Sequence, residues 1–401
     1  MATIIRQSYI DKIERYLGKE TIIVLVGQRR VGKSCMMKMI RDRKMADDGN
    51  NIIYIDKEKR EFDNIQTYQD LNDYIGLYFQ SDKHNYILID EIQDIKEFER
   101  SIRSYRTDPN TDIIITGSNA RMLSNELSTL IGGRYKEIYI QSLSYKEFLE
   151  FHQLSDNDEA LALYIQYGGL PGLAKIGLEE DDAREYQMDI YHTVLLKDVI
   201  MRNQIRNVPF LENLVRFLAD NTGKLISANS ISKYMKSQGE SIASAAITNY
   251  ISFLCEAYIL HKVNRYDIHG KRIFETNDKF YFEDNGIRNA IAGGTREGDI
   301  EKVIENIIYQ HLIRLGYQVY VGQLQAGEID FVCTKPGSER IYVQASYIIY
   351  DDATREREFG NLRAIKDNYP KYVISMTPLL TKNDDDGITH LHLRKFLTEG
   401  I

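Results

Sequence analysis

A glycine-rich segment near the N-terminus has the spacing of a phosphate-binding loop. It follows the pattern G-x-x-x-x-G-K-[ST] and reads Gly27-Gln28-Arg29-Arg30-Val31-Gly32-Lys33-Ser34. The flanking residues predict a strand before it and a helix after it, which is the context that this pattern requires. We expect backbone N–H groups to cradle phosphate oxygens, Lys33 to reach the β- and γ-phosphates of ATP, and Ser34 to bind Mg²⁺. The alternative is a glycine turn with a chance Lys-Ser pair.

Two adjacent acids, Asp90 and Glu91, end an apolar run at 86–89. In a parallel sheet such acids lie at the carboxyl ends of the strands, where ligands bind. We expect Asp90 to bind magnesium through water and Glu91 to orient or deprotonate the attacking water. A solvated strand end is the alternative for such a pair taken alone. The upstream phosphate loop favours the catalytic interpretation, and Glu91 indicates hydrolysis rather than binding alone.

Two later segments offer further groups for the same site. Ser118 and Asn119 follow an apolar run at 112–116, so we expect one of them beside the γ-phosphate, with a plain loop as the alternative. Arg134 precedes a predicted strand. It is a candidate arginine finger that stabilises the charge of the transferred phosphoryl group, in its own chain or in a neighbour. A surface arginine or a structural ion-pair partner is an equal alternative.

The elements that position these residues alternate between strands and helices. Apolar runs predict strands at 21–26, 51–56, 85–90, 112–116 and 136–140, and helical patterns occupy 8–17, 32–45, 66–80 and 98–105. Near-continuous apolar strands separated by helices indicate a parallel sheet that is covered on both faces. The fold class is therefore α/β, with a P-loop NTPase core.

The remaining chain divides by changes in pattern. Residues 144–206 predict helices, and helical patterns at 209–221, 230–237 and 241–255 precede a strand hairpin, which together resemble a winged helix. A last α/β block opens with a helix at 299–315 and continues with strands at 318–321, 328–333, 341–345 and 371–375. We therefore expect an ATPase core at 1–142, a helical lid at 143–206, a winged-helix domain at 207–290 and a C-terminal domain at 295–401.

The composition is that of a globular protein of several domains. The chain has 401 residues, 43% of them hydrophobic, and a net charge of −8. The acidic total offers no general basic surface for nucleic acid. No apolar stretch approaches the ~20 residues of a membrane span, the first residues lack a signal pattern, and three scattered cysteines imply no disulfide framework. We expect a cytoplasmic protein with no membrane partner.

Taken together, these motifs resemble the AAA+ superfamily ATPases of bacteria and archaea that carry a C-terminal domain similar to PD-(D/E)XK nucleases. The resemblance spans nearly the whole chain and rests on the phosphate loop, on Asp90-Glu91 and on several later segments: 116–118, 127–134, 143–149, 168–171, 279–286, 305–306 and 328–331. It implies an ATPase core, a helical lid, a winged helix and a small nuclease-like α/β domain. It also places Pro171, in a Gly-Gly-x-Pro element, near the adenine.

The same resemblance indicates a degenerate nuclease site. Glu305 matches the helical acid and Asp330 the strand acid of such sites, but Gln344-Ala345-Ser346 stands where Glu-x-Lys is expected. A neutral amide is a weaker metal ligand than a carboxylate, and serine cannot replace an ammonium group. Nuclease activity is therefore not expected, unless a displaced lysine such as Lys366 or Lys371 completes the site. Solvated strand ends are the simpler alternative for these acids.

The predicted winged helix has little to offer DNA. The helix at 241–255 has no Arg or Lys, whereas Lys262, Arg265, Lys271 and Arg272 gather around the hairpin. Such a patch predicts weak, sequence-independent nucleic-acid binding at most, and a solvated hairpin on a structural or protein-docking module is favoured.

Three functions remain from the sequence. The first is Mg²⁺-dependent ATP hydrolysis that moves the lid, the winged helix and the nuclease-like domain. The second is an ATP-bound signalling or scaffold switch with slow hydrolysis, which recruits a protein partner or another copy of itself. The third is an ATP-coupled nuclease or DNA-processing factor.

Overall fold

The computed structural model describes residues 4–119, 133–239, 242–268, 270, 272–294, 297–324, 327–378 and 383–401. The chain forms two compact units. The first comprises Met1–Gln141 with Glu256–Tyr258, and the second comprises Ser142–Cys255 with Ile259–Ile401. Each unit is described by itself.

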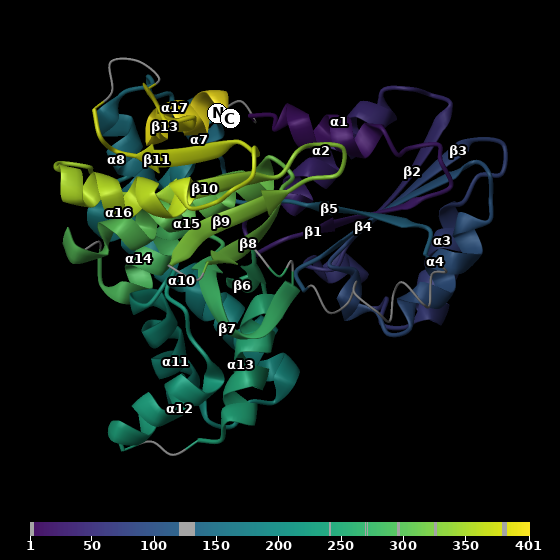
Figure 1. Ribbon diagram of the computed structural model, residues 1–401. Helices are drawn as coiled ribbons and strands as arrows, with labels where there is room; N and C mark the ends of the chain where they lie inside the picture. The colour runs from purple at the N-terminus through teal and green to yellow at the C-terminus, as the bar shows by residue number, and fades with distance from the viewer. Residues whose placement is uncertain are drawn as a thin grey trace. The chain divides into compact units, whose positions relative to one another are not determined.

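The first unit is built on a five-stranded sheet of order β2-β3-β4-β1-β5, in which every pair of neighbours is parallel (Figure 1). Its strands are β1 (Ile22–Val26), β2 (Asn50–Asp56), β3 (His84–Asp90), β4 (Thr111–Gly117) and β5 (Tyr135–Tyr139). All residues of β1 and β4 are buried, which explains why these strands read as unbroken apolar runs. The five strands predicted from the sequence are confirmed.

Helices cover both faces of this sheet. Alternate residues of β1 face opposite ways, so Ile23 and Leu25 join one core while Ile22 and Val24 join the other. The first core is closed by α1 (Gln7–Glu14) and α2 (Lys33–Met45), and the second by α3 (Tyr68–Tyr78) and α4 (Phe98–Arg106). Short 3₁₀ turns stand at Arg60–Phe62 and Ile92–Asp94.

The second unit begins with helices, as the sequence predicts for 144–206. They are α7 (Tyr145–His152), α8 (Asp158–Tyr167), α9 (Leu173–Ile176) and α10 (Glu180–Val194), followed by a π-helical stretch at Leu195–Met201. Three more follow, namely α11 (Val208–Asp220), α12 (Ala228–Ser237) and α13 (Ser244–Glu256). Every residue of α14 (Asn285–Ala292) is buried, and this helix packs on α8, α10 and α11.

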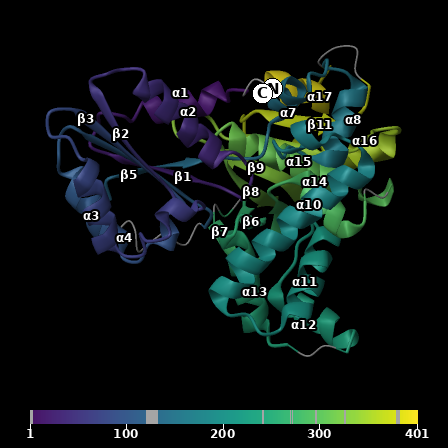
Figure 2. The same cartoon turned by 180° about the vertical axis from the view of Figure 1, so that it is seen from behind.

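A mixed eight-stranded sheet of order β12-β13-β11-β10-β9-β8-β6-β7 completes the second unit (Figure 2). Its first five strands in chain order are β6 (Leu260–Asp267), β7 (Arg272–Phe282), β8 (Gln318–Gln323), β9 (Glu328–Thr334) and β10 (Ile341–Ala345). Its last three are β11 (Lys371–Ser375), β12 (Asn383–Asp385) and β13 (Ile388–His392). One face packs on α15 (Ile300–Arg314) and α17 (Leu393–Glu399), and the other on α16 (Asp352–Arg363). A short 3₁₀ turn, Glu297–Asp299, precedes α15.

This sheet crosses the domain boundary expected between residues 290 and 295. Strand β6 pairs in parallel with β8, with Arg265 opposite Val321, and antiparallel with β7. The hairpin predicted as the wing therefore forms one edge of the C-terminal sheet. Its second strand, β7, pairs along both parts of β6, across a register shift between Val263 and Arg265.

Among the helices that the structure describes, none is long and apolar enough to cross a membrane.

Candidate active site

The predicted phosphate loop connects β1 to α2, at the carboxyl end of β1, which lies between β4 and β5. Gly27 has φ +137°, and a Cβ there would lie 2.1 Å from the carbonyl oxygen of Ile140, so only glycine fits. Gly32 has φ +106° and immediately precedes α2. Backbone conformation and close packing therefore explain both glycines of the motif, independently of any ligand.

The Lys33 ammonium folds back onto this loop. Its Nζ donates hydrogen bonds to the carbonyl oxygens of Gly27 (2.8 Å) and Gln28 (2.9 Å), and the residue is only 5% exposed. Phosphate oxygens are the stronger acceptors for an ammonium group, because those hydrogen bonds are charge-assisted on both sides. The lysine is thus held at the loop in the position from which it can turn to a phosphate.

An arginine that the sequence analysis missed supports the loop. Arg6, which is 5% exposed, donates from Nη1 to the carbonyl oxygens of Val31 (3.1 Å) and Gln141 (2.8 Å). Arg6 therefore links the phosphate loop to Gln141, which lies two residues after the end of β5. In the sequence, Arg6 is only a charged residue just before an amphipathic helix. That position indicates no function until the fold is known.

The two acids after the apolar run lie beside the loop. Ser34 hydrogen-bonds through its side chain to the Asp90 carboxylate, which also accepts a hydrogen bond from the Thr116 hydroxyl. Burial raises the pKa of Asp90, and these two hydrogen bonds only partly oppose the increase. The structure therefore brings together the two residues, Ser34 and Asp90, that were predicted to bind magnesium.

Thr116 links the two acids. Its hydroxyl donates to Asp90 and accepts a hydrogen bond from the backbone N–H of Glu91 (2.9 Å). Glu91 itself is 6% exposed and has φ +54°, a left-handed conformation that is uncommon for a residue with a side chain. Strained backbone of this kind is concentrated at functional sites.

The Glu91 carboxylate accepts a hydrogen bond from the side-chain amide of Gln93. This contact occupies one of the oxygens that would orient or deprotonate a water molecule. Gln93 lies two residues downstream, and no motif in the sequence marks it. It was missed because a glutamine has no pattern of its own.

A third acid at this edge was also missed. Asp56 ends β2 directly opposite Asp90 in the sheet register, is 4% exposed and lies 3.8 Å from the Lys38 Nζ. Parallel strands end at the same edge of a sheet. The sequence could therefore have indicated Asp56, because this acid ends an apolar run just as Asp90 does.

Ser118 and Asn119 directly follow β4, the strand between β3 and β1, and both are 1% exposed. Gly117 pairs with Val26, the last residue before the phosphate loop. The two residues therefore lie at the predicted edge, between the loop and the acids. A contact with the γ-phosphate stays a prediction.

Arg134 requires a correction. It immediately precedes β5, and its carbonyl oxygen accepts a hydrogen bond from Ile22 N (3.1 Å) at the beginning of β1. Since β1 and β5 are parallel, Arg134 lies at the amino end of the sheet, about 20 Å from the loop at ~3.3 Å per residue. The exposed Arg134 cannot act as a finger in its own chain, and only a role in a neighbouring chain stays open.

Pro171 belongs to the second unit, where it follows a tightly packed glycine pair. A Cβ on Gly169 would lie 2.4 Å from the Leu143 carbonyl oxygen, and the Gly169 N–H donates to Asp284 (2.8 Å). Packing thus accounts for this part of the motif. The role of Pro171 beside an adenine stays a prediction.

The C-terminal residues predicted from the nuclease resemblance do lie together, around a lysine that was not predicted. The Lys279 Nζ contacts Glu305 Oε1 (2.8 Å) and Asp330 Oδ1 (3.1 Å), and the Gln344 Oε1 accepts from Asp330 N (3.3 Å). Burial raises the pKa of Glu305 above its ordinary value. Burial alone would lower the pKa of Lys279, but the carboxylates around it outweigh that effect and raise it.

The two lysines proposed to complete that site are elsewhere. Lys366 is exposed, and the Lys371 Nζ donates to the Asp367 carbonyl oxygen (2.7 Å) at the beginning of β11. Gln344 pairs with Val373, two residues further along that strand. Lys279, contributed by β7, is the lysine that reaches the acids.

The basic patch on the hairpin is partly neutralised. Lys262 forms an ion pair with Asp278 (3.1 Å). The positive charge of Arg265 also attracts the Asp278 carboxylate. The side chains of Lys271 and Arg272 lie outside the described residues. The part of the patch that the structure describes thus gives little support to a strong phosphate contact.

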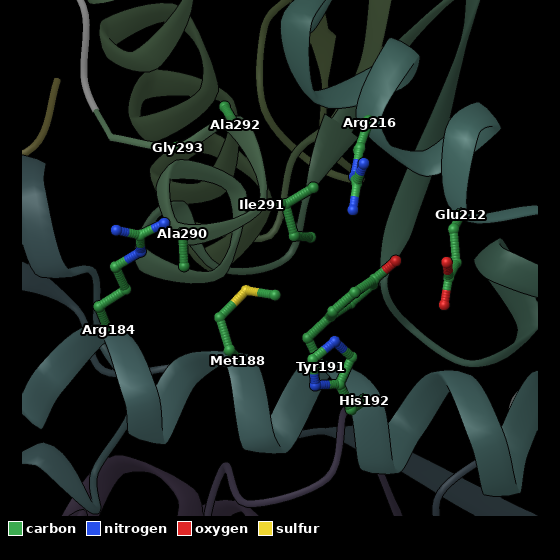
Figure 3. Close-up of a pocket in the computed structure, with 10 residues that line it drawn as sticks. All are labelled: Arg184, Met188, Tyr191, His192, Glu212, Arg216, Ala290, Ile291, Ala292 and Gly293. Carbon is green, nitrogen blue, oxygen red and sulfur yellow. The ribbon is translucent and has the colours of Figure 1, made fainter. Parts of the chain in front are cut away.

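A cavity of about 430 Å³ in the second unit contains neither the phosphate-loop residues nor Lys279 and its acidic partners in its walls (Figure 3). It lies among α10, α11 and α14. Figure 3 shows Met188 and Tyr191 on α10 facing Ile291 on α14, with Arg216 and Glu212 of α11 beside them. Arg184, His192, Ala290, Ala292 and Gly293 complete its lining.

The parallel sheet, the glycine loop and the acids beside it are the features of a P-loop nucleotide-binding fold. A family model described as an AAA domain matches residues 19–149, and a model described as a domain of unknown function (DUF8612) matches residues 158–298. The Walker-type ATPase PABY2304 of Pyrococcus abyssi has a similar fold, with a TM-score of 0.50, 14% identity and coverage of 72% of this chain and 96% of that chain.

More particularly, the chain belongs to the family of an uncharacterized protein of Haemophilus influenzae, with 33% identity over 99% of both chains. The uncharacterized protein MJ1544 of Methanocaldococcus jannaschii is 26% identical over 88% of this chain and 81% of its own length.

Proposed function

We propose that this chain binds Mg-ATP at the phosphate loop and hydrolyses it, with Glu91 as the base. The observation that carries the proposal is the hydrogen-bonded series Ser34–Asp90–Thr116–Glu91, which joins the loop to the ends of β3 and β4. Ser34 and Asp90 supply the hydroxyl and carboxylate oxygens that Mg²⁺ prefers. The ion, when bound with ATP, would neutralise phosphate charge, while Lys33 would bind the β- and γ-phosphates.

The test is ATP turnover and nucleotide affinity of the full chain. Lys33→Ala should abolish binding, whereas Glu91→Gln should keep Mg-ATP bound and slow hydrolysis by roughly 10²-fold or more, the size of effect of a positioned base. Lys44→Ala, at the far end of α2, and Glu97→Gln, another acid with positive φ, are matched controls that should turn over like wild type. Wild-type turnover in Glu91→Gln would reject the role of Glu91.

A specific contact favours a second function, an ATP-bound switch with slow hydrolysis. The Gln93 amide holds the Glu91 carboxylate, so the base is engaged until that hydrogen bond breaks. A protein partner, or a second copy of the chain, would then release it. Negligible basal turnover that rises on addition of a partner would favour this function over steady hydrolysis.

We further propose that nucleotide state moves the helices of residues 143–206 and the hairpin β6–β7, in the manner of a lid and a winged helix. Hydrogen exchange of Glu91→Gln with and without Mg-ATP tests this proposal. Changed protection outside the first unit is expected. Protection changes confined to the loop and the strand ends would contradict the coupling.

A further inference from the structure

A buried tyrosine hydroxyl faces the cavity among α10, α11 and α14. Tyr191 is only 5% exposed, and no described residue forms a hydrogen bond with its hydroxyl. Figure 3 shows the hydroxyl directed toward Arg216 and Glu212 of α11. Buried polar groups are normally hydrogen-bonded, so a buried hydroxyl that is aimed into a cavity indicates a partner from outside the chain.

Helical spacing brings the lining side chains to this one cavity. Arg184, Met188 and Tyr191 lie at i, i+4 and i+7 on α10, so they share one face of that helix. Glu212 and Arg216 lie at i and i+4 on α11 and are also neighbours. Since α14 packs on both α10 and α11, the end of α14 closes the space between these two faces.

The charged side chains of the cavity favour a negatively charged ligand. Arg184 and Arg216 carry two positive charges against the one negative charge of Glu212. Neither arginine forms an ion pair within the part of the chain that the structure describes. Burial, together with the Glu212 carboxylate, raises the pKa of Tyr191, so its hydroxyl keeps its proton and is able to donate. Guanidinium groups present their N–H donors in a fork that matches carboxylate and phosphate oxygens.

The rest of the cavity wall is apolar. Figure 3 shows Met188 on α10 facing Ile291 on α14, and Ala290 and Ala292 continue that wall. The volume of about 430 Å³ lies within the range of roughly 300–1,000 Å³ that is typical of small-molecule sites. The cavity therefore has room for a molecule that carries an apolar body beside its charged group.

We propose that this cavity binds a small organic oxyanion, namely a carboxylate or a phosphate monoester with an apolar body. The oxyanion accepts hydrogen bonds from the Tyr191 hydroxyl and the Arg216 guanidinium, while the body lies between Met188 and Ile291. Arg184, on the other side of Ile291 in Figure 3, adds a second positive charge. The site belongs wholly to the second unit and uses no residue of the phosphate loop.

The test is a titration of the full chain with phenyl phosphate and with benzoate, followed by ligand-observed NMR. The chain carries Lys33→Ala, so that the phosphate loop does not compete for the phosphate probe. One of the two probes should bind with a Kd of about 10⁻³ M or lower, a reasonable affinity for so few atoms. Inorganic phosphate lacks the apolar body and benzyl alcohol lacks the charge, so each should bind about tenfold more weakly or worse. Whichever probe binds more tightly identifies the oxyanion as a phosphate or a carboxylate.

Variants of the lining residues assign that binding to the cavity. Arg216→Gln should weaken it about tenfold or more, because a charge-assisted hydrogen bond is lost, and Tyr191→Phe should weaken it about three- to tenfold. Glu212→Gln removes the opposing charge and should strengthen binding. Arg202→Gln, which changes an exposed arginine of the same unit outside the cavity, is the matched control and should bind like the parent chain. Failure of both probes to bind, or binding that Arg216→Gln and Tyr191→Phe leave unchanged, would overturn the proposal.

Discussion

The side-chain amide of Gln93 donates a hydrogen bond to the carboxylate of Glu91, the residue that we propose activates water. This contact holds the base within its own chain, two residues from the donor. In the proposed hydrolysis, breaking this hydrogen bond would make both carboxylate oxygens of Glu91 available to the attacking water. The strength of that hydrogen bond helps to set the balance between an active ATPase and a slow switch.

Gln93→Ala removes the donor, and turnover should rise about three- to tenfold, since hydrogen bonds to charged groups contribute about 1.5–3 kcal/mol and part of this is recovered by water. Steady-state ATP hydrolysis at saturating ATP measures the effect. Gln66→Ala, an exposed glutamine before α3, is the control. Turnover equal to or below that of wild type would show that the contact positions Glu91 for catalysis instead of restraining it.

Thr116→Val should lower both stability and turnover. The change deletes the hydroxyl that joins Asp90 to the Glu91 N–H, at a cost of about 1–3 kcal/mol for the unsatisfied buried groups. Thr111 on the same strand is the matched control. Its buried hydroxyl has no hydrogen-bond partner among the described residues, so Thr111→Val should be neutral or stabilising. Equal urea-unfolding midpoints for the two variants would contradict this role of Thr116.

Arg134→Ala distinguishes a finger in a neighbouring chain from a surface arginine. If the exposed guanidinium serves a neighbour, the specific activity of wild type should rise with protein concentration, and the variant should lose that rise while keeping its ATP affinity. Lys136→Ala, exposed on β5, is the control. Turnover that is independent of both concentration and the substitution would leave Arg134 as a surface residue.

His311 should make stability depend on pH. Burial on α15 lowers its pKa to about 3 from an ordinary 6.5, so the unfolded chain takes up the proton first as pH falls. Stability conferred by the neutral ring is complete above pH 6.5 and is lost by up to about 1.4 kcal/mol per pH unit between 6.5 and 3. Urea unfolding at pH 7.5 and 5.5 should show a smaller loss for His311→Leu than for wild type. Exposed His192→Leu should behave like wild type, and a parallel loss in all three would contradict the prediction.

The C-terminal cluster should not cleave nucleic acid. With Lys279 in contact with Glu305 and Asp330, no open metal position with an activated water is available. Supercoiled plasmid incubated with the chain and Mg²⁺ or Mn²⁺ should stay intact, and Asp330→Ala should leave ATP turnover unchanged. Nicking that disappears in Asp330→Ala would restore the ATP-coupled nuclease as the function.

Local pattern was sufficient for the first unit's sheet and loop. The five strands, the glycines and Lys33-Ser34 are each encoded within short stretches, because strands buried on both faces, such as β1 and β4, are largely apolar and a phosphate loop is continuous in sequence. Asp90 and Glu91 were singled out for the same reason, since Asp90 ends β3 and Glu91 directly follows it.

Local sequence patterns could not predict contacts between residues that are distant in the chain. Lys279 meets acids 26 and 51 residues away, and its partners depend on β7 joining the same sheet as β9. Arg134 was placed near the phosphates by its position in sequence. The direction of a parallel strand puts the residue before it at the opposite edge from the loop. The chain order records which residues begin and end an element, whereas the packing of elements determines which of those ends share a site.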